Sequence, residues 1–180
     1  MCKEKENTGL IHIYCGSGKG KTTAGMGLCA RAAGHGMKVL ICQFLKDGSS
    51  GECAVLRLSR HVTFAESMPR VKFSFRMSPE EKEAARTFYN NLLKNVMHRA
   101  DAESFDVLFL DEVLYAVRAG LVEEEALVQF LKAKPRGLEV ILTGQDPGEE
   151  VLDLADYVSV IQKYRHPYDQ GVPARLGIEK

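Results

Sequence analysis

"CGSGKGKTT", residues 15–23, is the stretch of this 180-residue chain that decides its fold. It comes close to the Walker A pattern of phosphate-binding loops, G-x-x-x-x-G-K-[ST]. Counted back from "GKT" at residues 20–22, the pattern places its first glycine at position 15, but Cys15 is there and the glycine follows as Gly16. The loop is one residue shorter than usual, so the flanking sequence must show whether it still binds phosphate.

The segments on either side of the loop supply the setting that a phosphate loop needs. "LIHIY" (Leu10–Tyr14) predicts a buried strand, and the alanine-rich segment from Lys21 to about Ala33 predicts a helix. Glycines then let backbone N–H groups approach phosphate oxygens at the helix N-terminus. Lys21 would reach the phosphates, Thr22 would offer a hydroxyl to Mg²⁺, and Lys19 adds a second cation. This setting argues against the alternative, a glycine-rich turn without a ligand.

Apolar runs alternate with helical patterns along the whole chain. Continuous apolar strands separated by helices indicate a parallel sheet covered on both faces, with ligands beyond the carboxyl ends of the strands. We therefore predict an α/β, P-loop NTPase-like (RecA-like) three-layer fold with a mainly parallel sheet of about six strands. The expected strands are Leu10–Tyr14, Lys38–Phe44, Val62–Glu66, Asp106–Glu112, Leu138–Gly144 and Tyr157–Tyr164, and the expected helices are Lys21–Ala33, Ser78–Ala100, Glu123–Ala133 and Glu149–Ala155.

Composition narrows the class of protein. The chain is 45% hydrophobic and 27% charged, and its length suggests one domain over residues 1–180, with residues 1–8 expected to be flexible. Lysine plus arginine (24) equals aspartate plus glutamate (24), which argues against a dedicated nucleic-acid binder. No apolar run approaches the roughly 20 residues of a membrane span, and the N-terminus does not resemble a signal peptide. The five cysteines form no C-x-x-C pair, so we expect reduced thiols in a cytoplasmic protein.

The acidic pair Asp111-Glu112 follows an apolar strand. This is the Walker B arrangement, in which a carboxylate holds the metal directly or through water. The alternative is a solvated helix start, because acidic residues favour helix N-termini. Together with the phosphate loop, the pair favours a metal site.

Two aromatic residues, Phe73 and Phe75, flank Ser74 in the basic, loop-like segment from Met68 to Met77. Spacing of two could mean a short edge strand with both rings in the core, or two apolar groups facing a large planar ligand. The loop from Lys46 to Glu52 is a second segment that we expect to contribute to a site.

A phosphoryl-transfer enzyme must position water or an acceptor hydroxyl. Gln145, at the end of the fifth predicted strand, is a candidate, and no arginine-rich lid is evident in the sequence. The residues alone thus indicate a nucleoside triphosphate site with Mg²⁺, without showing that phosphate is the group transferred.

Five segments together resemble one family, the ATP:corrinoid adenosyltransferases of the P-loop type, which act on cob(I)alamin or cob(I)yrinic acid a,c-diamide. The resemblance runs from about Gly9 to Glu179, and its most specific part is the shortened loop joined to the "RHPYDQGV" tail. The segments are "GKGKTTAGMGLCARAAGHG", "QFLKDGSSGE", "LDEVLYAVRAGLV", "VILTGQDP" and "LDLADYVSVIQKYRHPYDQGVPARLGIE".

The resemblance implies transfer of the 5′-deoxyadenosyl group of ATP to the cobalt of a reduced corrinoid. Co(I) attacks the ribose C5′ and inorganic triphosphate leaves, so the reaction alkylates a metal and transfers no phosphoryl group. The cofactor supplies the nucleophile, and no protein base is required. The protein has to hold the triphosphate as a leaving group and present C5′ to cobalt.

The resemblance also assigns residues. Thr22, Asp111 and Glu112, with Glu112 foremost of the acidic pair, match the site for Mg²⁺ (or Mn²⁺), and Lys21, Phe73 and Phe75 are the expected catalytic residues. Phe73 and Phe75 fall where the family places two aromatics against the corrin, displacing the lower axial ligand so that Co(II) is easier to reduce. The triphosphate loop comprises Gly16, Ser17, Gly18, Lys19, Gly20, Lys21, Thr22 and Thr23.

The resemblance further implies a homodimer and a reduced flavoprotein as electron donor, whereas the charge balance and the apolar runs predict no nucleic-acid or membrane partner. This chain departs from the family pattern at Asp47, where glycine is usual, and at Gln145, where arginine is usual; it also has no tryptophan and few residues before Gly9. Two other functions stay open from the residues, a RecA-like ATPase and a nucleotide-dependent corrinoid-binding module.

Overall fold

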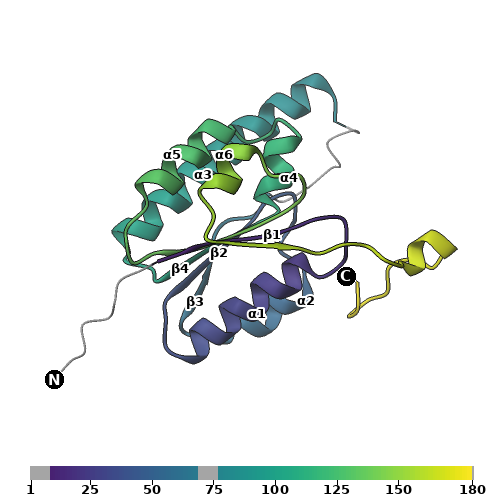
Figure 1. Cartoon of the computed structure of the whole chain (residues 1–180), viewed down its shortest axis with the longest axis horizontal. Coiled ribbons are helices and arrows are strands. Elements are labelled where there is room, and N and C mark those ends of the chain that lie inside the picture. The colour runs from purple at the N-terminus through teal and green to yellow at the C-terminus, as the bar shows by residue number, and fades with distance from the viewer. Residues whose placement is uncertain (1–8, 69–76, 180) are drawn as a thin grey trace.

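One sheet of six parallel strands organises the chain in the computed structural model, which describes residues 9–68 and 77–179 (Figure 1). The strand order is β3-β2-β4-β5-β1-β6, and every neighbouring pair is parallel. This confirms the predicted α/β class. The strands are β1 (Ile11–Cys15), β2 (Val39–Gln43), β3 (Val62–Phe64), β4 (Val107–Asp111), β5 (Glu139–Thr143) and β6 (Tyr157–Val160).

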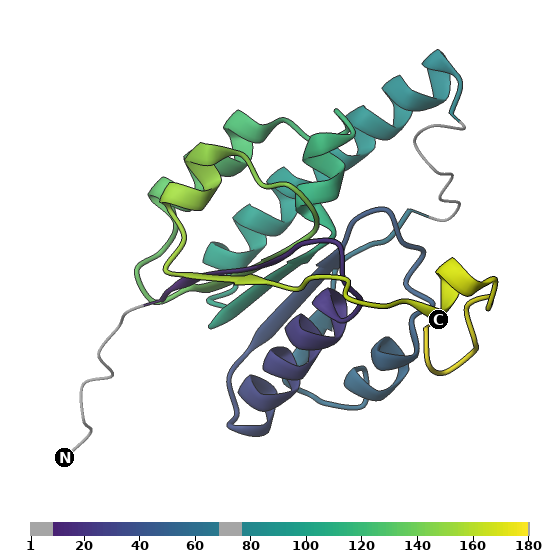
Figure 2. The same cartoon turned by 45° about the vertical axis from the view of Figure 1, so that its right-hand side comes forward.

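Helices cover both faces of the sheet and complete the three layers (Figures 1 and 2). One face carries α1 (Lys21–Gly34) and α2 (Gly51–Leu56). The other face carries α3 (Pro79–Ala102), α4 (Val113–Arg118), α5 (Glu124–Ala133) and α6 (Glu149–Asp153). A 3-10 helix, η2 (Pro167–Gln170), lies in the tail that follows β6.

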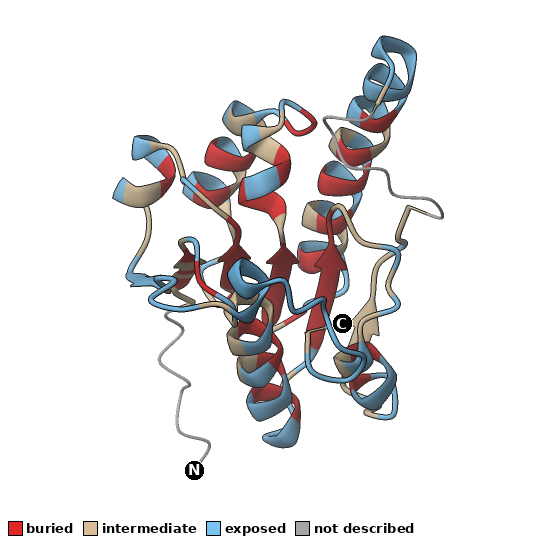
Figure 3. Ribbon diagram, turned by 90° about the vertical axis from the view of Figure 1, so that its right-hand side faces the viewer, coloured by how far each residue is buried: buried red, intermediate tan, exposed pale blue. Residues whose placement is uncertain are grey.

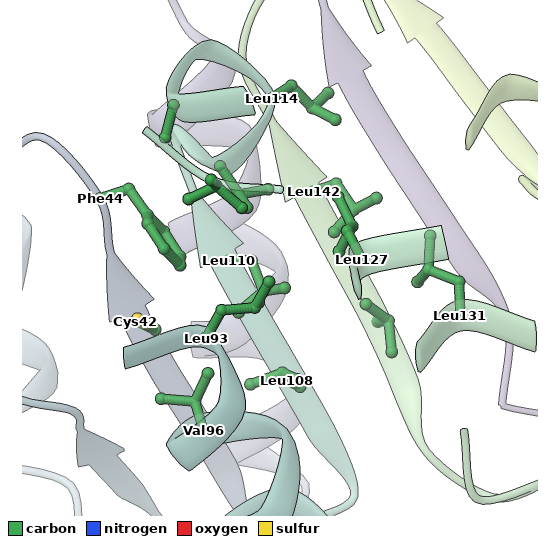
Figure 4. Close-up of a cluster of buried hydrophobic side chains, with 14 of the residues drawn as sticks. Cys42, Phe44, Leu93, Val96, Leu108, Leu110, Leu114, Leu127, Leu131 and Leu142 are labelled. Carbon is green, nitrogen blue, oxygen red and sulfur yellow. The ribbon is translucent and has the colours of Figure 1, made fainter. Parts of the chain in front are cut away.

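The central strands are buried along their whole length, as Figure 3 shows. Because side chains alternate across a strand, each strand feeds both cores. Leu40 and Cys42 pack on the side of α3, α4 and α5, whereas Val39 and Ile41 pack on the side of α1 and α2. Figure 4 shows Cys42 among the first of these two groups of side chains. This explains why these strands read as continuous apolar runs.

Three parts of the predicted fold were wrong in detail. The sixth strand ends at Val160 instead of Tyr164, and all four of its residues are exposed, so the sheet is not covered on both faces at this edge. The loop expected over residues 46–52 ends earlier, because α2 begins at Gly51. Neither α2 nor α4 was predicted, since six residues are too few to display a helical period.

The strand register brings the expected functional residues together. Gln43 at the end of β2 is opposite Asp111 at the end of β4, and Tyr14 of β1 is opposite Thr143 of β5. Parallel strands end at the same edge of the sheet, so the loop after β1 and the acidic pair after β4 meet there. No helix within residues 9–68 and 77–179 is long and apolar enough to cross a bilayer.

Two glycines of α1 provide a test of how closely this helix packs on the sheet. A Cβ at Gly25 would overlap the ring of Phe109, whereas a Cβ at Gly27 would meet no atom within 4 Å. We expect Gly25→Ala to lower the free energy of unfolding by about 1–3 kcal/mol, through overpacking. Gly27→Ala should instead raise it by up to about 1 kcal/mol, through helix propensity. Urea unfolding monitored by circular dichroism measures both, and equal effects would contradict the close packing.

Candidate functional site

The phosphate loop joins the end of β1 to the start of α1. Gly16 and Gly20 have φ values of 105° and 115°, which favour glycine, and Gly20 caps the N-terminus of α1. The Lys21 ammonium donates a hydrogen bond to the carbonyl oxygen of Gly18 at 2.9 Å. Lys21 therefore folds back over the loop, at the positive end of a 14-residue helix.

The segment after β6 packs directly against this loop. The Gly18 N–H donates to the Ile161 carbonyl at 2.7 Å, and the Lys163 N–H donates to the Ser17 hydroxyl at 3.3 Å. A Cβ at Gly16 would lie 2.6 Å from the Ile161 oxygen, and one at Gly18 would lie 2.8 Å from the Gln162 carbonyl. Glycine is thus required at both positions by packing against the chain itself, in addition to any approach of phosphate.

The carboxylate of Asp111 is the centre of the site. It is fully buried at the end of β4 and accepts four hydrogen bonds from side chains of other elements. Its Oδ1 accepts from the hydroxyls of Thr143 (2.8 Å) and Thr22 (3.0 Å). Its Oδ2 accepts from the amide of Gln43 (3.0 Å) and the ammonium of Lys46 (2.7 Å).

Glu112 follows on a strained backbone, with φ of 61°, as the N-cap residue of α4. Its backbone N–H donates to the Thr143 hydroxyl at 2.8 Å. Burial raises the pKa of the Glu112 carboxyl, and the nearby Asp111 raises it further, while Lys46 and Lys21 act in the opposite direction. Burial and the neighbouring Asp111 therefore disfavour the ionised form of the Glu112 carboxyl, and the two lysines offset only part of this effect.

The Thr22 hydroxyl and the Asp111 carboxylate are placed to share one cation. The Lys46 ammonium contacts both, at 2.8 Å from Thr22 Oγ1 and 2.7 Å from Asp111 Oδ2. This oxygen donor set suits Mg²⁺, which usually takes one or two carboxylates together with phosphate oxygens and water. No cluster of three or more His, Cys, Asp or Glu side chains that could hold a metal occurs among the described residues.

The C-terminal tail borders a small cavity beside the phosphate loop. Lys19 of the loop lies 3.5 Å from the Glu179 carboxylate, which also forms an ion pair with Arg175 at 2.8 Å. Two hydrogen bonds from the Arg175 guanidinium and one from the Arg175 backbone N–H lower the pKa of Glu179 to about 2, so it stays ionised. The cavity has a volume of about 280 Å³ and is lined by loop residues 17–19 and by tail residues that include Tyr168.

Several other predicted residues fall elsewhere. Thr23 is exposed on α1. Asp47 accepts hydrogen bonds from the backbone and hydroxyl of Ser49, and these lower its pKa. Gln145 is half-buried after β5, next to Asp146, which pairs with Arg118. Phe73 and Phe75 lie outside the described residues, as does the segment 1–8.

Cys15 ends β1 as a buried thiol. Burial is the main cause of its raised pKa, so it remains protonated and is a poor nucleophile. This agrees with its interpretation as a small residue that closes the first strand. Cys29, Cys42 and Cys53 are likewise buried and free.

A sequence model of one family, described as "ATP:corrinoid adenosyltransferase BtuR/CobO/CobP", matches residues 7–179. The chain belongs to this family. The resemblance stated from the motifs is thereby confirmed, and the chain is classed with transferases.

Curated relatives support the assignment over nearly the full chain. The "Corrinoid adenosyltransferase" of Escherichia coli (strain K12) is 32% identical over 180 residues, covering 99% of this chain and 89% of the relative. "Corrinoid adenosyltransferase CobA" of Salmonella typhimurium gives the same identity and coverage. The "Corrinoid adenosyltransferase" of Pseudomonas aeruginosa is 29% identical, covering 99% of this chain and 87% of the relative.

A solved structure shows the fold class. The KaiC-like protein PH0186 from Pyrococcus horikoshii OT3 superposes with a TM-score of 0.50, covering 87% of this chain and 73% of that chain. At 16% sequence identity this likeness concerns the fold alone. It agrees with the predicted P-loop NTPase-like architecture of this adenosyltransferase family member.

Sequence reasoning missed three side chains of the site, Gln43, Lys46 and Thr143. Gln43 and Thr143 carried a signal, because each is a polar residue at the carboxyl end of a strand that is otherwise apolar. Lys46 lies within a loop that we expected to contribute to the site. The sequence of that loop does not show whether the lysine side chain points into the site or into solvent. Its contact depends on a backbone turn at Leu45, where φ is 55°.

The raised pKa of Glu112 predicts a trade-off between stability and function. The folded protein holds this proton more tightly than the unfolded chain, so the stability contribution is present at low pH and lost as pH rises through the raised value. Without metal, Glu112→Gln should raise the unfolding temperature at pH 7.5 by a few degrees and flatten its pH dependence between pH 5 and 7.5. Exposed Glu83→Gln on α3 is the control; a Glu112→Gln protein that unfolds like this control would contradict the burial penalty.

Proposed function

We propose that this protein transfers the 5′-deoxyadenosyl group of ATP to the Co(I) centre of a reduced corrinoid, giving adenosylcobalamin or an adenosylated precursor. Co(I) donates its electron pair to C5′, the C5′–O5′ bond breaks, and triphosphate leaves with the electrons of that bond. The full-length family match carries this proposal, and the phosphate loop beside a buried carboxylate supports it.

The loop residues Gly16 to Thr23 would hold the triphosphate. The Lys21 ammonium, which donates to the Gly18 carbonyl oxygen of the same loop, would turn to bind phosphate oxygens, and Lys19 would add a second positive charge. The free N–H groups of the first turn of α1 favour the developing negative charge of the leaving group. Lys21 is therefore the residue that we assign to stabilising the departing triphosphate.

Mg²⁺ (or Mn²⁺) would be held by Thr22 and Asp111, with Glu112 adjacent. The shared contact of Thr22 and Asp111 with a single ammonium supports this site. When bound, the metal supplies further positive charge for the triphosphate. Thr143 and Gln43 orient the Asp111 carboxylate, each through one hydrogen bond, so its direction is fixed before any ligand arrives.

For the corrinoid, we assign Phe73 and Phe75 to contact with the corrin face, as the family resemblance implies. They would keep the lower axial ligand away from cobalt, which makes Co(II) easier to reduce. We further propose a reduced flavoprotein as the electron donor. A cytoplasmic location is supported by four buried cysteines that remain thiols.

The chemistry is tested by product analysis. The protein incubated with ATP, Mg²⁺ and chemically reduced cob(I)alamin should give the absorption spectrum of a Co–C bond and one triphosphate per adenosylated corrin. Thr22→Ala should lower this rate at least about tenfold, because it removes a metal and carboxylate contact. Exposed Thr87→Ala on α3 is the matched control.

Two outcomes would overturn the proposal. Release of ADP and phosphate without alkylation would identify a RecA-like ATPase. Binding of ATP and cob(I)alamin without any Co–C bond would identify a corrinoid-binding module.

The edge of the sheet supports a homodimer. Within residues 9–68 and 77–179, strand β6 pairs with β1 on one side only. Its Tyr157, Val158 and Val160 are 53%, 45% and 58% exposed. An apolar, unpaired strand edge favours pairing with another chain. We propose a second copy of this chain as the partner.

Light scattering of the eluting protein should give a mass of about twice the 20.0 kDa of one chain. Val158→Lys should shift the protein toward monomer by placing a charge in the proposed interface. Leu58→Lys, at a residue that is 86% exposed after α2, should leave the mass unchanged. A wild-type monomer at micromolar concentration would exclude this interface.

A further inference from the structure

Lys46 reaches the centre of the site from the loop that follows β2. Its ammonium lies 2.7 Å from Asp111 Oδ2 and 2.8 Å from Thr22 Oγ1, and its side chain is 26% exposed. The preceding residue, Leu45, has a φ of 55°, a conformation that a leucine rarely adopts. The backbone thus bears strain at the residue that turns Lys46 inward, which indicates a directed contact.

The Asp111 carboxylate needs a positive partner. Its other three hydrogen bonds come from neutral groups, two hydroxyls and an amide. A buried carboxylate without a counter-charge is strongly destabilising, and neutral donors offset only part of this cost. The described side chain that brings a full positive charge into contact with Asp111 is Lys46.

The two oxygens that Lys46 contacts are the two that we assign to the metal. A cation bound by both at Mg²⁺–oxygen distances of roughly 2.1 Å would lie within the space of the ammonium. The two positive charges would also repel each other strongly at such separation. Metal and ammonium therefore exclude one another at this position.

We propose that Lys46 is an internal counter-cation that occupies the metal position in the nucleotide-free protein and is displaced when metal and ATP bind. The inference rests on the proposed metal site. Its consequence is twofold: the carboxylate stays correctly oriented without metal, and free metal binds weakly because it has to displace a covalently tethered competitor. The partial exposure of Lys46 gives the ammonium a route out of the site.

The competition is measurable without turnover. Mn²⁺ alone is the probe, and electron paramagnetic resonance reports free and bound Mn²⁺ in the nucleotide-free protein. Lys46→Met keeps the unbranched stem of the side chain and removes the ammonium with its charge. We expect it to bind Mn²⁺ at least tenfold more tightly than wild type, since the carboxylate then lacks its competitor. Its unfolding temperature in chelator should fall by several degrees and recover when Mn²⁺ is added.

The controls separate this inference from general effects. Lys94→Met, an exposed position on α3, should leave both readouts unchanged. If Lys46→Met does not fold without metal, Lys46→Gln, which keeps a hydrogen-bond donor but no charge, replaces it with the same expected gain in Mn²⁺ affinity.

Unchanged or weaker Mn²⁺ binding in the neutral variants would overturn the inference. Loss of ATP binding by the same factor with Mn²⁺ and with chelator would also overturn it, because Lys46 would then be a phosphate ligand. These outcomes differ from failure of the proposed function, in which wild type makes no Co–C bond whatever the metal affinity of the variants.

Discussion

The buried negative charge of Asp111 is the constraint on which the rest of the site depends. Its four hydrogen bonds come from β2, β5, the first turn of α1 and the loop after β2. Each donor is neutral except Lys46, so the arrangement is complete only with one cation in place. The Asp111 carboxylate holds the carboxyl ends of three neighbouring strands together, and the proposed metal would bind the same carboxylate. The packing of the strand ends and the proposed metal site therefore depend on one charge.

A second constraint ties the phosphate loop to the end of the chain. Gly18 donates to the Ile161 carbonyl, and a side chain at Gly16 or Gly18 would collide with the residues after β6. An additional residue between β1 and Gly20 would have to pass this same backbone. The shortened loop and the tail therefore pack against each other, which gives a physical reason why both occur in the same sequence.

Much of the fold could be predicted because the central strands are buried on both faces and so read as unbroken apolar runs. The same reasoning made the predicted sixth strand too long, because Ile161 and Gln162 leave the sheet after β6 and contact the phosphate loop. The meeting of Thr22 with the acidic residue at the end of β4 followed from strand ends sharing one edge. Lys46 could not be predicted, because its contact depends on the left-handed turn at Leu45, which no local pattern signals.

The two acidic residues Asp111 and Glu112 differ in their hydrogen bonds, and this difference bears on the type of reaction. Both oxygens of Asp111 are occupied by donors, so this residue is not free to take a proton from water. Glu112, with its raised pKa, is the acid whose carboxylate is not tied to Thr22 or Lys46 by a hydrogen bond in this structure, and in a hydrolase it would be the base. Co(I) brings an electron pair and no proton to remove, so attack on carbon makes no use of a base. In such a transfer Glu112 would be left for the proposed metal, and the orientation of ATP, with C5′ or the γ-phosphate toward the acceptor, would decide which reaction this geometry serves.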